Sequence, residues 1–133
     1  MNILVDTHIL LWFFTDDPRL NEKTKKIYLD TKNKLSVSAA TFWEIAIKAS
    51  LGKITLKKNW LTLMKKHLYE NAIQWLPISP EHCHQLSLLP FHHRDPFDRM
   101  LIAQAMVEEM KVLTSDPHLK KYEVECIDLR PST

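Results

Sequence analysis

Short apolar runs alternate with longer amphipathic segments along this chain. The short runs are typical of strands buried on both faces of a sheet, whereas the longer segments repeat their apolar residues at helical spacing. The predicted strands are 3–5, 34–37, 73–76, 111–114 and 124–127. The predicted helices are 7–15, 22–31, 40–51, 59–70, 82–88, 97–110 and a short one at 117–121.

Helices separate the predicted strands, so the strands need crossover connections rather than tight turns. This order favours an α/β fold, a three-layer α/β/α sandwich around a central parallel sheet of about five strands. A length of 133 residues suits one domain spanning 1–133. Gly52 is the single glycine, placed as a helix C-cap. Walker A loops and dinucleotide-binding turns need several glycines, so both classes are excluded.

Four acidic residues follow predicted strands or begin predicted helices. Asp6 directly follows the first strand, and Asp116 follows the fourth. Glu44 lies in the helix after the second strand, and Asp98 near the start of the last long helix. The carboxyl ends of parallel strands line one crevice, so these four side chains are expected to converge.

Capping is the alternative role for each acid, because Asp and Glu are favoured in the first turn of a helix. Asp95, which precedes a proline at a helix start, is expected to be such a cap. Glu44 either reaches back to Thr41 in a capping box or, if Ser38 is the cap, lies inside the helix and faces the cleft. Asp6 is the strongest site candidate, because an ionisable group after a buried strand needs a partner.

Four converging carboxylates repel one another unless a hard divalent cation holds them together. Mg²⁺ or Mn²⁺ is therefore the expected cofactor, with phosphodiester hydrolysis as the reaction. Without the four acids, 12 Asp and Glu stand against 18 Lys and Arg, an excess of six positive charges. A basic rim suits a polyanionic substrate, although a solvated lysine surface explains the same charge.

The cysteines and the apolar runs of the sequence indicate the cellular location of the protein. Two cysteines without a CxxC pair predict neither a disulfide framework nor a zinc site. The longest apolar run, 9–14, is too short to span a bilayer, and the start does not look like a signal peptide. We therefore expect a cytoplasmic protein with no membrane partner.

Four stretches in order resemble the successive motifs of PIN-domain ribonucleases, in particular the toxins of VapBC toxin–antitoxin pairs. They are LVDTH at 4–8, SAATFWEIA at 38–46, HRDPFDRMLIAQA at 93–105 and LTSD at 113–116. The likeness runs from about residue 2 to 129. It implies a Mg²⁺- or Mn²⁺-dependent RNA endonuclease that forms a homodimer and is masked by an antitoxin protein. Asp6, Glu44 and Asp98 match the family's invariant acids, and Asp116 matches a more variable fourth acid.

Other residues near these motifs have weaker assignments. Asp95 matches a position that is commonly acidic in the family, near the ligands of the metal. Thr114 or Ser115 could orient Asp116 or hold a water of the metal. Contacts to RNA phosphate are considered for three residues that flank the Asp98 helix or lie within it: His93, Arg94 and Arg99. Four tryptophans in apolar patterns are expected in the core or at a dimer interface.

Two other classes stay open. A phosphoacceptor receiver domain has similar size and alternation, but resembles a pattern with adjacent acids after the first strand, where this chain has Thr7 and His8 after Asp6. A catalytically silent, PIN-like RNA-binding module is the third possibility.

Overall fold

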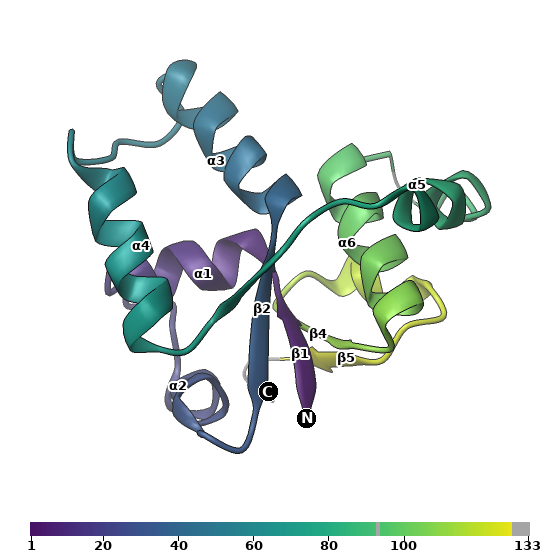
Figure 1. Ribbon diagram of the computed structural model, residues 1–133, viewed down its shortest axis with the longest axis horizontal. Helices are drawn as coiled ribbons and strands as arrows, with labels where there is room; N and C mark the ends of the chain where they lie inside the picture. Colours follow the sequence, from purple (N-terminus) through teal and green to yellow (C-terminus); the bar gives the residue numbers. More distant parts are fainter. Residues whose placement is uncertain (93, 129–133) are drawn as a thin grey trace.

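Five parallel strands form the central sheet, in the order β3-β2-β1-β4-β5 (Figure 1). The computed structural model describes residues 1–92 and 94–128. Leu4 in the middle strand lies opposite Ser36 on one side and Val112 on the other. The strands are β1 Asn2–Val5, β2 Lys34–Ser38, β3 Gln74–Leu76, β4 Lys111–Thr114 and β5 Cys126–Asp128. The predicted parallel sheet is confirmed.

Every predicted helix is present, with ends within two residues of the prediction. The helices are α1 Thr7–Phe14, α2 Glu22–Leu29, α3 Ala39–Ser50, α4 Trp60–Glu70, α5 Pro80–Ser87, α6 Pro96–Glu108 and the 3₁₀ helix η1 Pro117–Lys121. Among the described residues, no helix is long and apolar enough to cross a bilayer. Gly52 follows α3 with a left-handed φ of 71°, which a C-capping glycine adopts without strain.

Alternate residues of each strand point to opposite faces of the sheet and give the molecule two apolar cores. Ile3 and Val5 face a core that α1, α2, α3 and α4 help to build, whereas Leu4 faces a core built with α6 and η1. In Figure 1, α1, α2 and α4 lie to one side of the strands, and α5 and α6 lie to the other. The predicted three-layer α/β/α sandwich is confirmed.

The connections place several helix starts at one edge of the sheet. β1 leads directly into α1, β2 into α3, and β4 into η1, so these helices begin at the carboxyl ends of their strands. The Asp6 amide donates to the Leu113 carbonyl at 3.0 Å, which ties the first of these junctions to β4. This edge is where the sequence predicts the functional site.

The tryptophans, which are predicted to lie in the core or at a dimer interface, fall into two pairs. Trp12 and Trp60 pack partly against the core, but Trp43 on α3 is 63% exposed and Trp75 on the edge strand β3 is 52% exposed. Apolar patterning marks a non-polar environment but does not distinguish a core position from an outer helix face or a sheet edge.

Candidate metal centre

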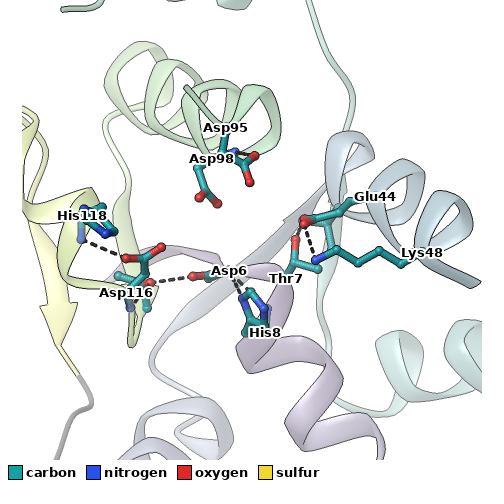
Figure 2. A network of polar contacts seen from close by, with 11 residues as sticks. Asp6, Thr7, His8, Glu44, Lys48, Asp95, Asp98, Asp116 and His118 are labelled. Carbon is teal, nitrogen blue, oxygen red and sulfur yellow. Dashed lines mark hydrogen bonds and ion pairs between the residues drawn. The ribbon is translucent and has the colours of Figure 1, made fainter. Parts of the chain in front are cut away.

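Carboxylates from four separate segments approach one another at the carboxyl edge of the sheet. Asp98 points from α6 toward the Asp6 and Asp116 side chains, and Glu44 lies across from them on α3 (Figure 2). Burial raises the pKa of Asp98 from 3.8 to about 8, helped by the negative charges of Asp95, Asp6, Asp116 and Glu44 in that order. The predicted convergence of the four acids is therefore present.

Asp6 is held at the end of β1 by hydrogen bonds to both carboxylate oxygens. It is 2% exposed and caps α1, with Oδ1 accepting from the His8 amide at 3.1 Å. The Thr114 hydroxyl donates to Oδ2 at 2.5 Å and accepts the Asp116 amide at 2.9 Å. Thr114 thus fixes Asp6 and the backbone of Asp116 together, and Ser115 is half-buried beside it.

Glu44 lies inside α3 and does not cap it. The Ser38 hydroxyl accepts the Ala40 amide and forms the N-cap, so the alternative capping box with Thr41 is wrong. Thr41 instead accepts a hydrogen bond from the Thr7 hydroxyl at 3.0 Å. Glu44 is 5% exposed, and its Oε2 lies 2.9 Å from the Lys48 ammonium nitrogen.

Asp95 and Asp98 lie on the first turn of α6 but have different surroundings. Asp95 is exposed and caps the helix by accepting from the Phe97 and Asp98 amides, as expected from its place before a proline. Asp98 is half-buried and directed at the cleft. Asp116 caps η1 by accepting a hydrogen bond from the His118 amide at 2.9 Å. It is therefore both a helix cap and a member of the cluster of four acids, Asp6, Glu44, Asp98 and Asp116.

The chemistry of the cluster fits a hard divalent cation. Its donors are carboxylate and hydroxyl oxygens. Burial first, and then the negative charges of the neighbouring acids, raise the pKa of Asp98. Within the part of the chain that the structure describes, no three His, Cys, Asp or Glu side chains are close enough to hold one ion together. Glu44 is turned toward Lys48 (Figure 2).

Arg99 departs from its predicted role. Its side chain is predicted to contact RNA phosphate, but it is 5% exposed, and its guanidinium donates to the Leu86, Leu89 and Pro90 carbonyls. It therefore holds the end of α5 against α6. Arg94 is exposed at the start of α6, where an RNA contact stays a prediction, and His93 lies outside the described residues.

A pocket of about 270 Å³ lies beside the acids and is lined by three residues that can carry positive charge. These are His8 in the first turn of α1, Arg19 in the loop between α1 and α2, and Lys48 on α3, and Asp17 also lines the pocket. Arg19 is paired with Asp17 at 2.8 Å and stacks on Trp12. The Asp6 carboxylate, which accepts a hydrogen bond from the His8 ring, raises the pKa of His8 and favours its protonated form at this rim.

Lys48 is the site residue that sequence reasoning missed. It is absent from the predicted site residues, yet its side chain is only 31% exposed and contacts Glu44. The signal was present in the sequence, because an acid and a lysine at positions i and i+4 of a helix lie on one face.

The comparisons with known proteins agree with the fold. The PIN domain family matches residues 3–125. Ribonuclease VapC22 of Mycobacterium tuberculosis is 24% identical over 124 residues, which cover 90% of this chain and 91% of that protein.

Solved structures give the same architecture at low sequence identity. VapBC2 from Rickettsia felis, bound to a DNA fragment from its promoter, superposes with a TM-score of 0.75 at 13% identity, over 96% of this chain and 98% of that one. FitAcB from Neisseria gonorrhoeae gives a TM-score of 0.67 at 16% identity, over 95% and 96%. With the family match over nearly its whole length and the acids at the carboxyl edge of a five-stranded parallel sheet, this chain belongs to the PIN domain family.

Proposed function

We propose that this PIN domain is a Mg²⁺- or Mn²⁺-dependent endoribonuclease that hydrolyses RNA phosphodiester bonds. The observation that carries the proposal is the environment of Asp98, a half-buried carboxylate whose pKa is raised by burial and by four other acids. Such a concentration of negative charge is costly unless a cation neutralises it. The similarity to a ribonuclease over 90% of the chain supports RNA as the substrate.

Asp6, Glu44, Asp98 and Asp116 would hold the metal, with Asp95 as a cap near them. A divalent cation bound there supplies Lewis-acid stabilisation of the charge that develops on the phosphate. Thr114 orients Asp6 through its hydroxyl and Asp116 through the backbone amide. His8, Arg19 and Lys48 line the adjacent pocket and suit the negative backbone of RNA, as does exposed Arg94.

We further propose that the protein is the toxin of a type II toxin–antitoxin pair, acts in the cytoplasm and forms a homodimer. The similar solved proteins include VapBC complexes and FitAcB, which supports a cognate antitoxin as the partner. An antitoxin arginine placed in the cleft would form charge-assisted bonds with carboxylates that otherwise hold metal.

Membership of the PIN family removes the receiver-domain alternative. The catalytically silent RNA-binding module is separated by experiment. Purified, partner-free protein should cleave single-stranded RNA with Mg²⁺ or Mn²⁺ and lose this activity in excess chelator. Metal-independent cleavage would contradict the proposed chemistry, and RNA binding without cleavage in either metal would favour the silent module.

The toxin role has its own test. Production of the protein alone should halt bacterial growth, and co-production of its antitoxin should restore growth. The Asp98→Asn variant, produced at the same level, serves as the control and should be harmless. Undisturbed growth with an active, RNA-cleaving protein would argue against the toxin role while leaving the nuclease proposal intact.

A further inference from the structure

Glu44 and Lys48 form an ion pair inside the acidic site. The ammonium nitrogen lies 2.9 Å from Oε2 of Glu44, and the two side chains are 31% and 6% exposed. The Lys66–Glu70 pair on α4 has the same four-residue separation, but its atoms are 3.7 Å apart and both side chains are more than half exposed. The pair on α3 is therefore shorter and much better shielded from solvent than an ordinary surface pair.

The other site acids are held by different groups. Asp6 accepts bonds from a backbone amide and the Thr114 hydroxyl, and Asp116 accepts the His118 amide. The two amides and the hydroxyl are neutral, so they orient a carboxylate while leaving its charge available to a cation. His8 Nδ1 lies farther away, 3.8 Å from Oδ1 of Asp6, and adds positive charge only when the imidazole is protonated. Lys48 instead supplies a full positive charge to Glu44. A lysine at this position would weaken metal binding in two ways. Its ammonium group pairs with a carboxylate oxygen of Glu44 that the metal needs, and its positive charge repels the metal cation.

We propose that Lys48 is a positioning residue that occupies Glu44 in the metal-free protein and is displaced from it when the metal binds. The inference rests on the proposed metal-dependent function and deepens it. It means that α3 carries both a metal ligand, Glu44, and the cation that competes with the metal for it, Lys48. Lys48 then sets the metal concentration at which the site fills. Displacement leaves its ammonium at the pocket that it lines together with His8.

A purely structural role gives a different expectation. Glutamate and lysine at positions i and i+4 stabilise a helix slightly, even where no metal site is present. If the pair does only this, removing Lys48 changes the melting temperature slightly and leaves metal affinity unchanged.

The test is calorimetric titration of Mn²⁺ into the metal-free, full-length protein. Lys48→Met keeps most of the apolar stem and removes the charge, so it should bind Mn²⁺ roughly tenfold more tightly, the low end of the effect of groups that contact metal ligands. Lys48→Arg keeps a positive charge near Glu44 and should bind as weakly as the parent. Lys66→Met removes a lysine from the exposed pair on α4 and is the matched control, with no expected change.

A double variant tests whether Lys48 affects Mn²⁺ affinity through Glu44. In a Glu44→Gln background the gain from Lys48→Met should shrink, because the contested carboxylate is absent. Equal or weaker binding by Lys48→Met than by the parent overturns the proposal. If Asp98→Asn abolishes Mn²⁺ binding while Lys48→Met binds Mn²⁺ like the parent, the proposed metal site is supported and the proposed role of Lys48 is wrong. A parent protein that binds no Mn²⁺ contradicts both.

A second measurement needs no variant. Acetic anhydride labelling, mapped by peptide mass spectrometry, should modify Lys48 faster when Mn²⁺ is present, because the amine has lost its ion pair. Lys66 in the same sample should react at one rate with and without the metal. A Lys48 rate that stays constant or falls on adding Mn²⁺ would refute the displacement.

Discussion

At the scale of single residues, Asp98 has the strongest electrostatic signature in the site. Its carboxyl group is half-buried, and four other acids add to the effect of burial on its pKa. A carboxyl group with a pKa of about 8 keeps its proton in the metal-free protein at neutral pH. The same repulsion that raises the pKa favours a cation when one is available.

This pKa predicts how stability depends on pH. Between the ordinary value of 3.8 and about 8, folded Asp98 holds a proton that the unfolded chain has released. Raising the pH through this window therefore lowers the free energy of unfolding of the metal-free protein, and the loss is complete above about pH 8. One pKa unit corresponds to about 1.4 kcal/mol, so even part of the shift is measurable.

Urea unfolding of the metal-free protein at pH 5.5, 7 and 9, compared with Asp98→Asn, checks the prediction. The variant has no proton to lose at this position, so its stability should decline less over the window and exceed that of the parent at pH 9. Parallel pH profiles for the two proteins would contradict the raised pKa.

At the scale of secondary-structure elements, Arg99 joins α5 to α6. Its guanidinium reaches carbonyls at the end of α5, 2.8–3.4 Å away, and donates to the Tyr122 hydroxyl at 3.3 Å. Arg99→Met leaves these groups without their donor and should lower the free energy of unfolding by about 2 kcal/mol or more. Arg99→Lys should also destabilise, because an ammonium group cannot reproduce the planar fork of donors.

Urea titration of the parent and both variants checks the role of Arg99. Two results together would favour an RNA contact instead. Arg99→Met would be as stable as the parent but bind RNA more weakly, and Arg99→Lys would match the parent in both stability and RNA binding.

The same elements show how far the sequence leads. Capping residues and turn signals locate the helix starts, because Ser38, Ser79 and Asp95 act through bonds to residues two or three positions away. The acids meet because parallel topology brings strand ends together. Arg99 could not be placed, because α6 lies between the sheet and α5 and is buried from Arg99 through Ala105 except at Met100. Periodicity cannot identify the outer face of such a helix.

At the scale of the whole molecule, the two apolar cores share one sheet. Ile9 packs in the core on the α1 side, and Ile102 in the core on the α6 side, and both are fully buried. Because β1 contributes residues to both cores, we expect residues 1–133 to unfold as one domain.

Ile9→Val and Ile102→Val, which should each cost about 0.5–1.5 kcal/mol, test this. Each variant should shift a single transition, with the same midpoint by tryptophan fluorescence and by far-UV circular dichroism. Two separate transitions, one moved by each variant, would mean that the cores are independent units.

The central claim is that the four converging acids form a metal-dependent nuclease site. The most direct measurement is the rate of single-stranded RNA cleavage in Mn²⁺ for the parent, Asp98→Asn and Asp95→Asn. The two variants make the same change three residues apart at the start of α6. Asp98→Asn removes a proposed ligand, so its rate should fall by more than the roughly 10–100-fold typical of residues behind the ligands. Asp95→Asn should keep most of the activity, because Asn caps a helix nearly as well as Asp. Near-parental activity in Asp98→Asn, or a larger loss in Asp95→Asn, would contradict the account.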